Sequence, residues 1–291
     1  MLSNIKRKKS IAGVVTLYNP QDDVYENIMT YIHALDILYV MDNSETINEE
    51  LVKKITCLQN VEYIKNKYNL GIAKSLNIAL DMACFKYKWL LTMDQDSSFH
   101  SGGIESYFDF LVRMDEKKNY AITCLRNGQE ALEAEASRTI YQERAITSGM
   151  IVNVQLAYDC DGFDEKLFID EVDYEFCYRC NAKGYKLQLY PVCIMNHTIG
   201  EPIFNNIAKP VSWFLGKKSF EAQNEKPFRL YYIYRNSLYV ASKYGMIRKY
   251  YYSLLKRLVK IIFAEPDKRE KINYIVRGIS DYYLGKMGKL E

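Results

Sequence analysis

The sequence predicts an α/β fold built on parallel βαβ units, with a helical extension at the C-terminus. Two observations support this prediction. Through the first hundred residues, short apolar runs rich in β-branched side chains alternate with segments of helical periodicity, which is the pattern of a parallel sheet with crossover helices. Near the C-terminus, residues 243–263 place apolar side chains along one face of a helix. With 48% hydrophobic residues, the 291-residue chain can bury a substantial core.

The predicted elements follow one another in order. Strands are expected at the four short apolar runs, residues 11–17, 37–41, 61–65 and 89–93. Helices are expected over the periodic segments between them, residues 24–35, 51–58 and 72–83. The last segment is the clearest, because its apolar residues recur at i, i+4, i+7, i+8 and i+11. Ligands of such sheets bind outside the carboxyl ends of the strands, so the residues that follow each strand are candidate site residues.

Composition and missing motifs exclude several classes of function. The 39 basic and 36 acidic residues give a net charge of +3, too small for a general nucleic-acid-binding surface. No uncharged apolar run reaches the roughly 18 residues of a membrane span. The chain has neither a G-x-G-x-x-G after its first strand nor a P-loop, which argues against Rossmann dehydrogenases and P-loop NTPases. Seven scattered cysteines indicate reduced thiols in a cytosolic protein, and structural zinc on Cys177 and Cys180 is a weaker alternative.

Polar residues follow all four predicted strands, in the segments 18–20, 42–44, 66–71 and 94–97. Each segment alone is compatible with ordinary turn chemistry. Asp94 and Asp96 lie two residues apart at a strand end, so both carboxylates can reach one Mg²⁺ or Mn²⁺ ion. Their position distinguishes them from Asp159 and Asp161, which have the same spacing but lead into Gly162 and predict a turn.

A second acidic cluster has two interpretations. Four acids fall within six residues, at Asp170, Glu171, Asp173 and Glu175. In the structural interpretation, Asp170 is a helix N-cap and Glu175 pairs with Arg179 at i, i+4. In the functional interpretation, one carboxylate is a general base, because so many like charges repel one another unless a cation or an acidic proton is near. His197, one of three histidines, is either a metal ligand or a hydrogen-bonded polar residue.

Taken in order, these motifs resemble the family 2 glycosyltransferases of the GT-A fold. The resemblance covers roughly residues 10–240 and is nearest to the bacterial rhamnosyltransferase branch, which builds O-antigen and capsule. It includes a late R-x-Y-Y-x-x-R-N segment that runs from Arg229 to Asn236. The chain departs from many relatives in two places. Leu17 separates Thr16 from Tyr18, and the acidic pair reads Asp170-Glu171 instead of Glu-Asp.

The resemblance implies a role for each matching residue. The GT-A catalytic domain would span residues 1–210, with a nucleotide-sugar half at about 1–100, an acceptor half at about 101–210 and a helical extension over 211–291. The metal, Mn²⁺ or Mg²⁺, would be held by Asp94, Asp96 and His197, and the base would be Asp170, Glu171 or Asp173. The residues expected to bind the nucleotide sugar are Tyr18, Asn19, Asp42, Asn43, Asn69, Gly71, Lys74, Asp94 and Gln95.

The implied activity is inverting, metal-dependent transfer of a sugar, L-rhamnose from dTDP-L-rhamnose, to a glycan or lipid-linked glycan during polysaccharide assembly. A UDP-hexose donor and a catalytically silent, nucleotide-sugar-binding membrane partner are the alternatives. The expected location is the cytoplasm. Residues 243–263 contain six basic residues and no acid, so this helix would lie either on the inner face of the membrane or against the catalytic domain or a second subunit of a homo-oligomer. No nucleic-acid partner is expected.

Overall fold

The computed structural model describes residues 10–113, 119–126, 139–197, 202–203 and 222–291. The chain forms two compact units. The first combines Met1–Glu165 with Val172–Thr198, and the second combines Lys166–Glu171 with Ile199–Glu291. The segment Lys166–Glu171 therefore belongs to the second unit, although residues of the first unit flank it on both sides in the sequence.

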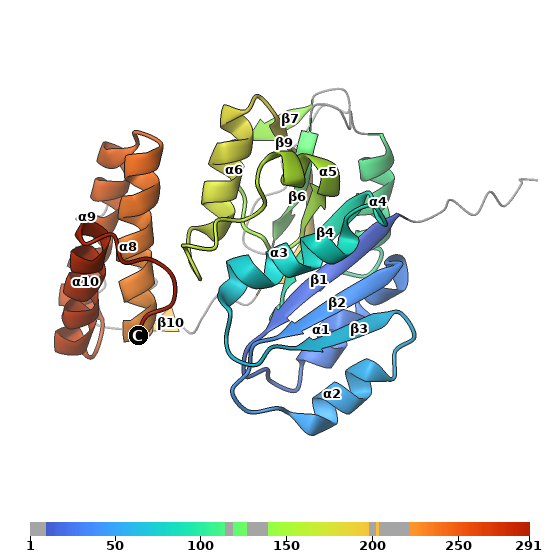
Figure 1. Cartoon of the computed structure of the whole chain (residues 1–291), viewed down its shortest axis with the longest axis horizontal. Helices are drawn as coiled ribbons and strands as arrows, with labels where there is room; N and C mark the ends of the chain where they lie inside the picture. Colours follow the sequence, from blue (N-terminus) through green and yellow to red (C-terminus); the bar gives the residue numbers. More distant parts are fainter. Residues whose placement is uncertain (1–9, 114–118, 127–138, 198–201, 204–221) are drawn as a thin grey trace, which may run out of the picture. The chain divides into compact units, whose positions relative to one another are not determined.

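Within the described residues, nine strands of the first unit form one mixed sheet (Figure 1). They are β1 (Ile11–Leu17), β2 (Ile37–Asp42), β3 (Val61–Lys65), β4 (Trp89–Asp94), β5 (Ser97–Phe99), β6 (Asn119–Arg126), β7 (Ile140–Gln142), β8 (Met150–Asn153) and β9 (Lys186–His197). Their order is β3-β2-β1-β4-β8-β6-β9-β5, and β7 pairs with β9. The four predicted strands are confirmed, and the parallel pairing of β3, β2, β1 and β4 places their carboxyl ends at one edge.

Helices cover both faces of this sheet. The helices of the first unit are α1 (Val24–Met29), α2 (Glu49–Thr56), α3 (Gly71–Ala83), α4 (Gly103–Val112), α5 (Val154–Asp159) and α6 (Val172–Ala182). Side chains of α1, α2 and α4 share one core cluster with Ile11, Val15 and Leu17 of β1. Because side chains alternate across a strand, the buried residues of α3 pack on the opposite face (Figure 1). Both faces are thus covered, which explains why the strands read as continuous apolar runs.

The helix predicted over residues 24–35 is wrong in its second half. The α-helix ends at Met29, and a short 3₁₀ turn follows at Ile32–Ala34. Tyr31 has φ −136°, outside the helical region, and its side chain is buried in the core. Tertiary packing of Tyr31 and its neighbours therefore determines the backbone conformation after Met29, although the helical spacing of apolar residues continues.

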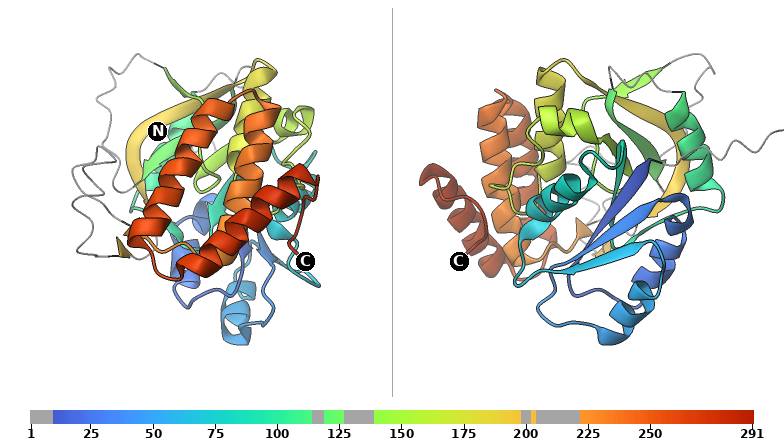
Figure 2. Two further views of the ribbon diagram at one scale, coloured as in Figure 1. Left: turned by 90° about the vertical axis from the view of Figure 1, so that its left-hand side faces the viewer. Right: turned by 45° about the vertical axis from the view of Figure 1, so that its right-hand side comes forward.

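The second unit is helical, with a short antiparallel pair of strands, β10 (Pro202–Ile203) and β11 (Ala222–Gln223). Its helices are α8 (Pro227–Lys243), α9 (Ile247–Ala264) and α10 (Lys268–Tyr283), coloured orange to red in Figure 2. A core of Leu230, Tyr234, Leu254, Ile261 and Ile275 joins the three helices. The helix predicted over 243–263 begins at Ile247, since Gly245, at φ +68°, turns the chain after α8. None of the described helices combines the length and apolar character needed to cross a bilayer.

Gly278 sets the separation of α8 and α10. A Cβ atom built on this buried residue would lie 2.4 Å from the backbone oxygen of Tyr231. We therefore expect Gly278→Ala to push the helices apart and to lower the free energy of unfolding by about 1–3 kcal/mol. Urea denaturation measures the change, with Ser280→Ala, an exposed site on the same helix, as the control. Equal midpoints for the two variants would contradict this close contact.

Candidate active site

The turns that follow β1, β2 and β4 are hydrogen-bonded to one another at the carboxyl edge of the sheet. The backbone N–H of Tyr18 donates to Oε1 of Gln95 at 2.8 Å, and Nε2 of Gln95 donates to the Tyr18 carbonyl at 3.3 Å. Asn27 donates to the carbonyl of Gln95 at 3.1 Å. The N–H of Asn19 donates to Oγ of Ser44 at 2.9 Å. The structure thus brings together polar segments that are far apart in the sequence.

Asp42, at the end of β2, is a buried carboxylate with partners on both oxygens. Its side chain accepts hydrogen bonds from the N–H of Ser44 at 2.7 Å and from the hydroxyl of Tyr63 at 2.5 Å. Burial and then this bond to Asp42 raise the pKa of Tyr63, so the phenol stays protonated and remains a donor. Lys65 lies 3.9 Å from Asp42 and donates to the carbonyl of Ser44. These contacts fix the Asp42 carboxylate in one orientation.

Asn43 organises the loop that leads into α3. Its amide nitrogen donates to Oγ of Ser75 at 2.9 Å and to the Gly71 carbonyl at 3.4 Å. Its amide oxygen accepts from Nδ2 of Asn66 at 2.9 Å and from the N–H of Leu70 at 3.2 Å. The hydrogen-bonding capacity of this buried side chain is used inside the protein, so Asn43 shapes the edge of the sheet.

The predicted Asn69-Leu70-Gly71 motif forms the start of α3. Gly71 has φ +81°, a left-handed conformation that favours glycine, and its N–H donates to Oδ1 of Asn69 at 2.9 Å. Asn69 and Gly71 thus build a tight turn at a helix N-terminus, which is a favourable environment for anions.

Removal of the Asn43 side chain should destabilise the first unit. In Asn43→Ala, the buried side chains of Ser75 and Asn66 each lose a partner, and each unsatisfied buried polar group costs about 1–3 kcal/mol. We expect a loss of at least about 2 kcal/mol in the free energy of unfolding. Asn48→Ala is the matched control, because it removes one amide that caps α2 and should cost only about 1 kcal/mol. Equal losses in urea denaturation would refute a central role for Asn43.

Asp94 and Asp96 lie at the carboxyl end of β4, on either side of Gln95. Asp94 is the last residue of β4, and Asp96 directly precedes β5. In the antiparallel pairing of β5 with β9, His197 lies opposite Ser97, the residue that follows Asp96. Thr16 pairs with Asp94 between β1 and β4, and its buried hydroxyl has no hydrogen-bond partner among the described residues. Within those residues, no group of three His, Cys, Asp or Glu side chains is arranged to hold a metal by itself.

Lys74 and Asn77, on one face of α3, hold the segment that precedes the second acidic cluster. Lys74 forms an ion pair with Glu165 at 2.9 Å, and this hydrogen bond raises the pKa of Lys74. Asn77 donates to Glu165 at 3.0 Å and to the carbonyl of Phe163 at 2.9 Å. Neither Asn77 nor Glu165 was among the residues predicted from the sequence. The sequence could have indicated Asn77, because it lies three residues after Lys74 on a predicted helix and therefore on the same face.

Asp170 and Glu171, in the second unit, have different environments. The guanidinium of Arg229 contacts Oδ1 of Asp170 through Nη2 at 3.0 Å and Nε at 3.2 Å, and Oδ2 through Nε at 3.3 Å. Burial raises the pKa of Asp170, and Arg229 opposes that shift. Glu171 accepts hydrogen bonds from two neutral hydroxyls, those of Ser237 at 2.9 Å and Tyr250 at 2.8 Å.

Asp170 is not the N-cap that the sequence suggested. The helix α6 begins at Val172, and both residues before it have left-handed backbones, with φ 60° at Asp170 and 63° at Glu171. Asp173 lies in the first turn of α6, where its carboxylate accepts from the N–H of Tyr174 at 2.8 Å. The sequence pattern missed this kink because its cause lies about 66 residues further along the chain.

That cause is α8, which holds the backbone of the segment Lys166–Glu171. Phe168 is a third residue of the segment with a left-handed backbone, at φ 62°. The amide of Asn236 donates to three of its carbonyls, at 2.7, 2.7 and 3.1 Å, those of Leu167, Ile169 and Asp170. Nε of Arg235 donates to the amide oxygen of Asn236 at 2.9 Å, which fixes the direction of the Asn236 amide. The R-x-Y-Y-x-x-R-N segment therefore supports the acidic segment.

Glu175 and Arg179 are structural. The predicted i, i+4 pair is confirmed at 2.7 Å, with Glu175 fully buried. Arg179 also donates to the carbonyls of Cys160 and Gly162, and thereby closes the turn after α5. The predicted turn at Asp159–Gly162 is confirmed, with φ 61° at Asp161. The Asp-x-Asp spacing in this turn thus has a local structural explanation.

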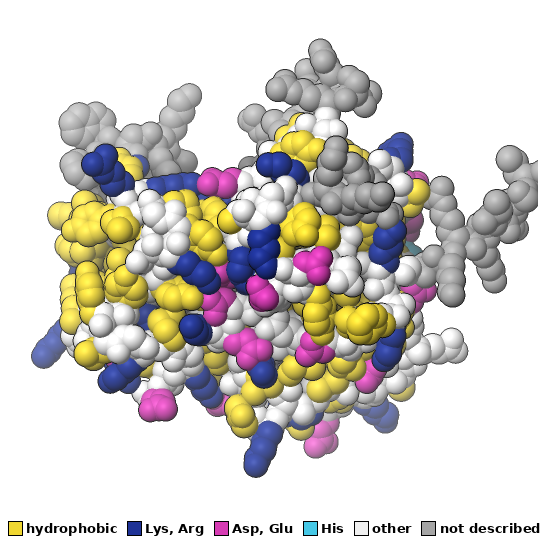
Figure 3. All heavy atoms as spheres, turned by 45° about the horizontal axis from the view of Figure 1, so that its top comes forward, with side chains coloured by type: hydrophobic (Ala, Val, Ile, Leu, Met, Phe, Trp, Pro, Cys, Tyr) yellow, Lys and Arg dark blue, Asp and Glu magenta, His cyan; other side chains and the backbone are white. Residues whose placement is uncertain are grey.

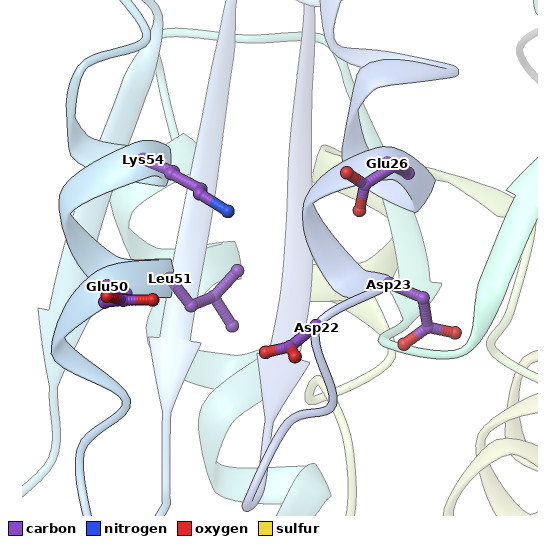
Figure 4. Close-up of a pocket in the computed structure, with 6 residues that line it drawn as sticks. All are labelled: Asp22, Asp23, Glu26, Glu50, Leu51 and Lys54. Carbon is purple, nitrogen blue, oxygen red and sulfur yellow. The ribbon is translucent and has the colours of Figure 1, made fainter.

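A shallow pocket of about 280 Å³ opens beside the turn after β1, and Figure 4 shows side chains from α1 and α2 on its two sides. Its lining residues are Asp22, Asp23, Glu26, Glu50, Leu51 and Lys54. Four carboxylates against one lysine would repel a nucleotide diphosphate. This pocket is therefore a poor place for the phosphates of a nucleotide sugar.

Comparisons with known proteins show the class of enzyme and the fold. Residues 14–151 match the family model of glycosyl transferase family 2. The chain is a glycosyltransferase with a family 2 domain, and its mixed sheet with a helical C-terminal unit is a GT-A fold.

Individual relatives extend the likeness over nearly the whole chain. The dTDP-rhamnosyl transferase RfbF of Shigella flexneri is 26% identical over 93% of both chains. The crystal structure of S. aureus TarS 1–349 in complex with UDP-GlcNAc superimposes with a TM-score of 0.52 at 15% identity, over 95% of this chain and 73% of that one. The crystal structure of GalNAc-T7 with UDP, GalNAc and Mn²⁺ gives a TM-score of 0.53 at 12% identity, over 65% and 44%. At these identities, the two solved structures bear on the fold alone.

Proposed function

We propose that this glycosyltransferase moves L-rhamnose from dTDP-L-rhamnose to a hydroxyl of a glycan acceptor, with inversion, in the assembly of a cell-surface polysaccharide such as O-antigen or capsule. The observation that carries the donor assignment is the identity to a dTDP-rhamnosyl transferase over 93% of both chains. The UDP and UDP-GlcNAc complexes of the two structural neighbours make a UDP-hexose the alternative donor.

The carboxyl edge of the first unit supplies the donor site in this proposal. The linked turns at Tyr18, Asn19, Asp42 and Gln95 receive the nucleotide, and the N-terminus of α3 with Asn69, Gly71 and Lys74 lies at the sugar diphosphate. Each of these turns is hydrogen-bonded before any ligand arrives, so binding orders few side chains.

We assign Mn²⁺ or Mg²⁺ to Asp94, Asp96 and His197 from the chemistry of their donor atoms. Carboxylate oxygens are the ligands these hard cations prefer, and an imidazole nitrogen suits Mn²⁺. In support, His197 pairs in register with Ser97, the residue that follows Asp96. When bound there, the cation would neutralise negative charge that develops on the leaving nucleotide. Gln95, between the two acids, binds the backbone of Tyr18 and so fixes the turn that carries them.

Asp170 is the proposed general base. It removes the proton of the acceptor hydroxyl as the new bond to the anomeric carbon forms, and the old bond's electron pair leaves with the nucleotide diphosphate. Burial raises the pKa of Asp170, which makes the carboxylate a better proton acceptor. Arg229 makes two contacts to Oδ1 but one to Oδ2, so Oδ2 is the proposed acceptor atom. Glu171 binds two hydroxyls and Asp173 a backbone N–H, and both carboxylates thereby have structural partners.

The second unit offers a surface for an anionic membrane, and we place the enzyme at the cytoplasmic face, where a lipid-linked acceptor would be presented. Ile247, Tyr251 and Leu255 are exposed apolar residues of α9, and Arg248 and Lys249 are exposed beside them. Hydrophobic and basic side chains lie side by side on the face seen in Figure 3. Co-sedimentation with phosphatidylglycerol vesicles tests this membrane binding. We expect the double variant Arg248→Glu, Lys249→Glu to sediment with the vesicles less than the wild type does. A dimer that added salt does not dissociate would instead indicate that this surface is the interface of a homo-oligomer.

Thermal stability with nucleotide sugars tests the donor directly. At about 100 times its dissociation constant, a ligand stabilises the fold by about 2.7 kcal/mol. We expect dTDP-L-rhamnose with Mn²⁺ to raise the melting temperature more than UDP-glucose, UDP-galactose or UDP-GlcNAc does. A larger response to a UDP sugar would replace the donor and leave the class of enzyme unchanged.

A further inference from the structure

We propose that α8 positions the general base: Asn236 fixes the backbone of the segment Lys166–Glu171, and Arg229 orients the carboxylate of Asp170. The inference rests on the proposed function, because it takes Asp170 to be the base. It assigns positioning roles to two side chains of the helical unit, which would otherwise be a structural appendage.

The backbone of the segment requires outside support. Three of its six residues, Phe168, Asp170 and Glu171, adopt the left-handed conformation without being glycine. Each such residue costs about 1 kcal/mol or more, and strain of this kind persists only where surrounding contacts hold it. Here the contacts come from Asn236, which is fully buried and bonds three carbonyls of the segment. Without that amide, the segment would relax to an unstrained path and Asp170 would move.

Arg235 in turn holds the side-chain amide of Asn236. Its guanidinium donates to the Asn236 oxygen at 2.9 Å and to the carbonyl of Gly288 at 2.8 Å. It also lies over the rings of Tyr231 and Tyr232, at 5.0 and 5.1 Å. A buried cation held by these groups leaves the Asn236 amide one orientation, with its N–H groups toward the acidic segment.

Arg229 acts on the carboxylate itself. Asp170 is only 13% exposed, whereas the Arg229 side chain is 49% exposed. An exposed ion pair that served stability alone would contribute little, yet this one orients a largely buried acid through three contacts. Among the residues that the structure describes, Glu225 and Arg257 also act on Asp170, and they pair with each other at 3.1 Å. Arg229 is therefore the cation that bonds Asp170 directly.

The sign of the pH effect follows from the charge. Arg229 lowers the pKa of Asp170 against the upward shift from burial, so Arg229→Gln should raise that pKa. The base acts in its ionised form, and the acid limb of kcat/KM should therefore move to higher pH in Arg229→Gln. Arg229→Lys, which keeps the charge, should stay near the wild-type profile. Arg269→Gln, which removes an exposed arginine from α10, is the matched control.

Asn236→Asp tests the backbone support. It replaces the amide donors with a second oxygen that cannot bond the carbonyls, and a displacement of the base by about 1 Å can cost about a hundredfold in rate. We expect kcat to fall about a hundredfold while the thermal stabilisation by dTDP-L-rhamnose is unchanged. Circular dichroism shows whether Asn236→Asp is folded. If this variant does not fold, the Arg229 variants still test the proposal.

The outcomes separate the inference from the proposed function. If Asp170→Asn is inactive but Arg229→Gln has the wild-type pH profile and Asn236→Asp the wild-type kcat, α8 has no positioning role. If Asp170→Asn keeps wild-type turnover, Asp170 is not the base, and the inference fails together with that assignment. A shifted profile in Arg229→Gln alone, with Arg229→Lys and Arg269→Gln unshifted, is the result that supports it.

Discussion

Replacement of Asp96 by alanine is expected to reduce metal-dependent turnover by about a thousandfold or more. Asp96 lies in the turn after β4 and directly precedes β5, the strand that pairs with β9, whose last residue is His197. In the proposed site Asp96 is a metal ligand. Stabilisation of the leaving diphosphate by a bound metal amounts to several kcal/mol. Each loss of about 1.4 kcal/mol lowers the rate tenfold. Donor hydrolysis and transfer, each measured over a Mn²⁺ titration, give the loss.

Asp161→Asn is the matched control for Asp96→Ala. Asp161 belongs to the second Asp-x-Asp motif of the chain, is exposed and pairs with Lys183 at 3.1 Å. Asparagine tolerates the left-handed conformation at this position, so the turn should survive. We expect wild-type turnover in this variant. Wild-type turnover and metal response in Asp96→Ala would exclude Asp96 as a metal ligand.

Asp170→Asn should reduce turnover by about 10²–10⁴-fold, the usual contribution of general base catalysis. Asparagine has nearly the same shape but cannot accept the proton of the acceptor hydroxyl. Because the donor site lies on residues of the first unit in our proposal, stabilisation by dTDP-L-rhamnose should persist. Steady-state transfer rates and thermal shifts, measured on the same preparation, separate loss of chemistry from loss of donor binding.

Two neighbouring acids serve as controls for Asp170→Asn. Glu171→Gln retains an oxygen and an amide near the hydroxyls of Ser237 and Tyr250, and Asp173→Asn retains an acceptor for the N–H of Tyr174. We expect each to lose much less activity than Asp170→Asn. If Asp173→Asn instead shows the largest loss of activity, the base lies on α6, and Arg229 orients a carboxylate that does not take part in catalysis.

Much of the first unit was predictable from the sequence because local patterns determine it. The strands β1, β2 and β4 are buried on both faces, and such strands read as continuous apolar runs between turns. The Glu175–Arg179 pair and the Asp159–Gly162 turn involve residues within four positions of one another. The polar turns at the strand ends also followed, since parallel connectivity places those ends at one edge.

The errors arose where distant contacts outweighed local preference. Apolar periodicity continued past Met29, but burial of Tyr31 ends the helix there. Acids before α6 resembled a helix cap, but both take a left-handed backbone that no local pattern favours. The four hydrogen bonds by which the amide of Asn43 holds the loop before α3 also join distant residues, and no local pattern predicted them.

The sequence by itself therefore determined the strands β1 to β4, their parallel arrangement and the acids and turns that follow them, because spacing along the chain encodes each of these. Only the tertiary structure decided which acid of the second cluster has which partner. The segment Lys166–Glu171 is too short and too strained to fix its own conformation, and it takes its shape from Asn236 and Arg229 about 60 residues later. Hydrogen bonds across that separation leave no periodic trace in the sequence, so folding alone brings the proposed base to its partners.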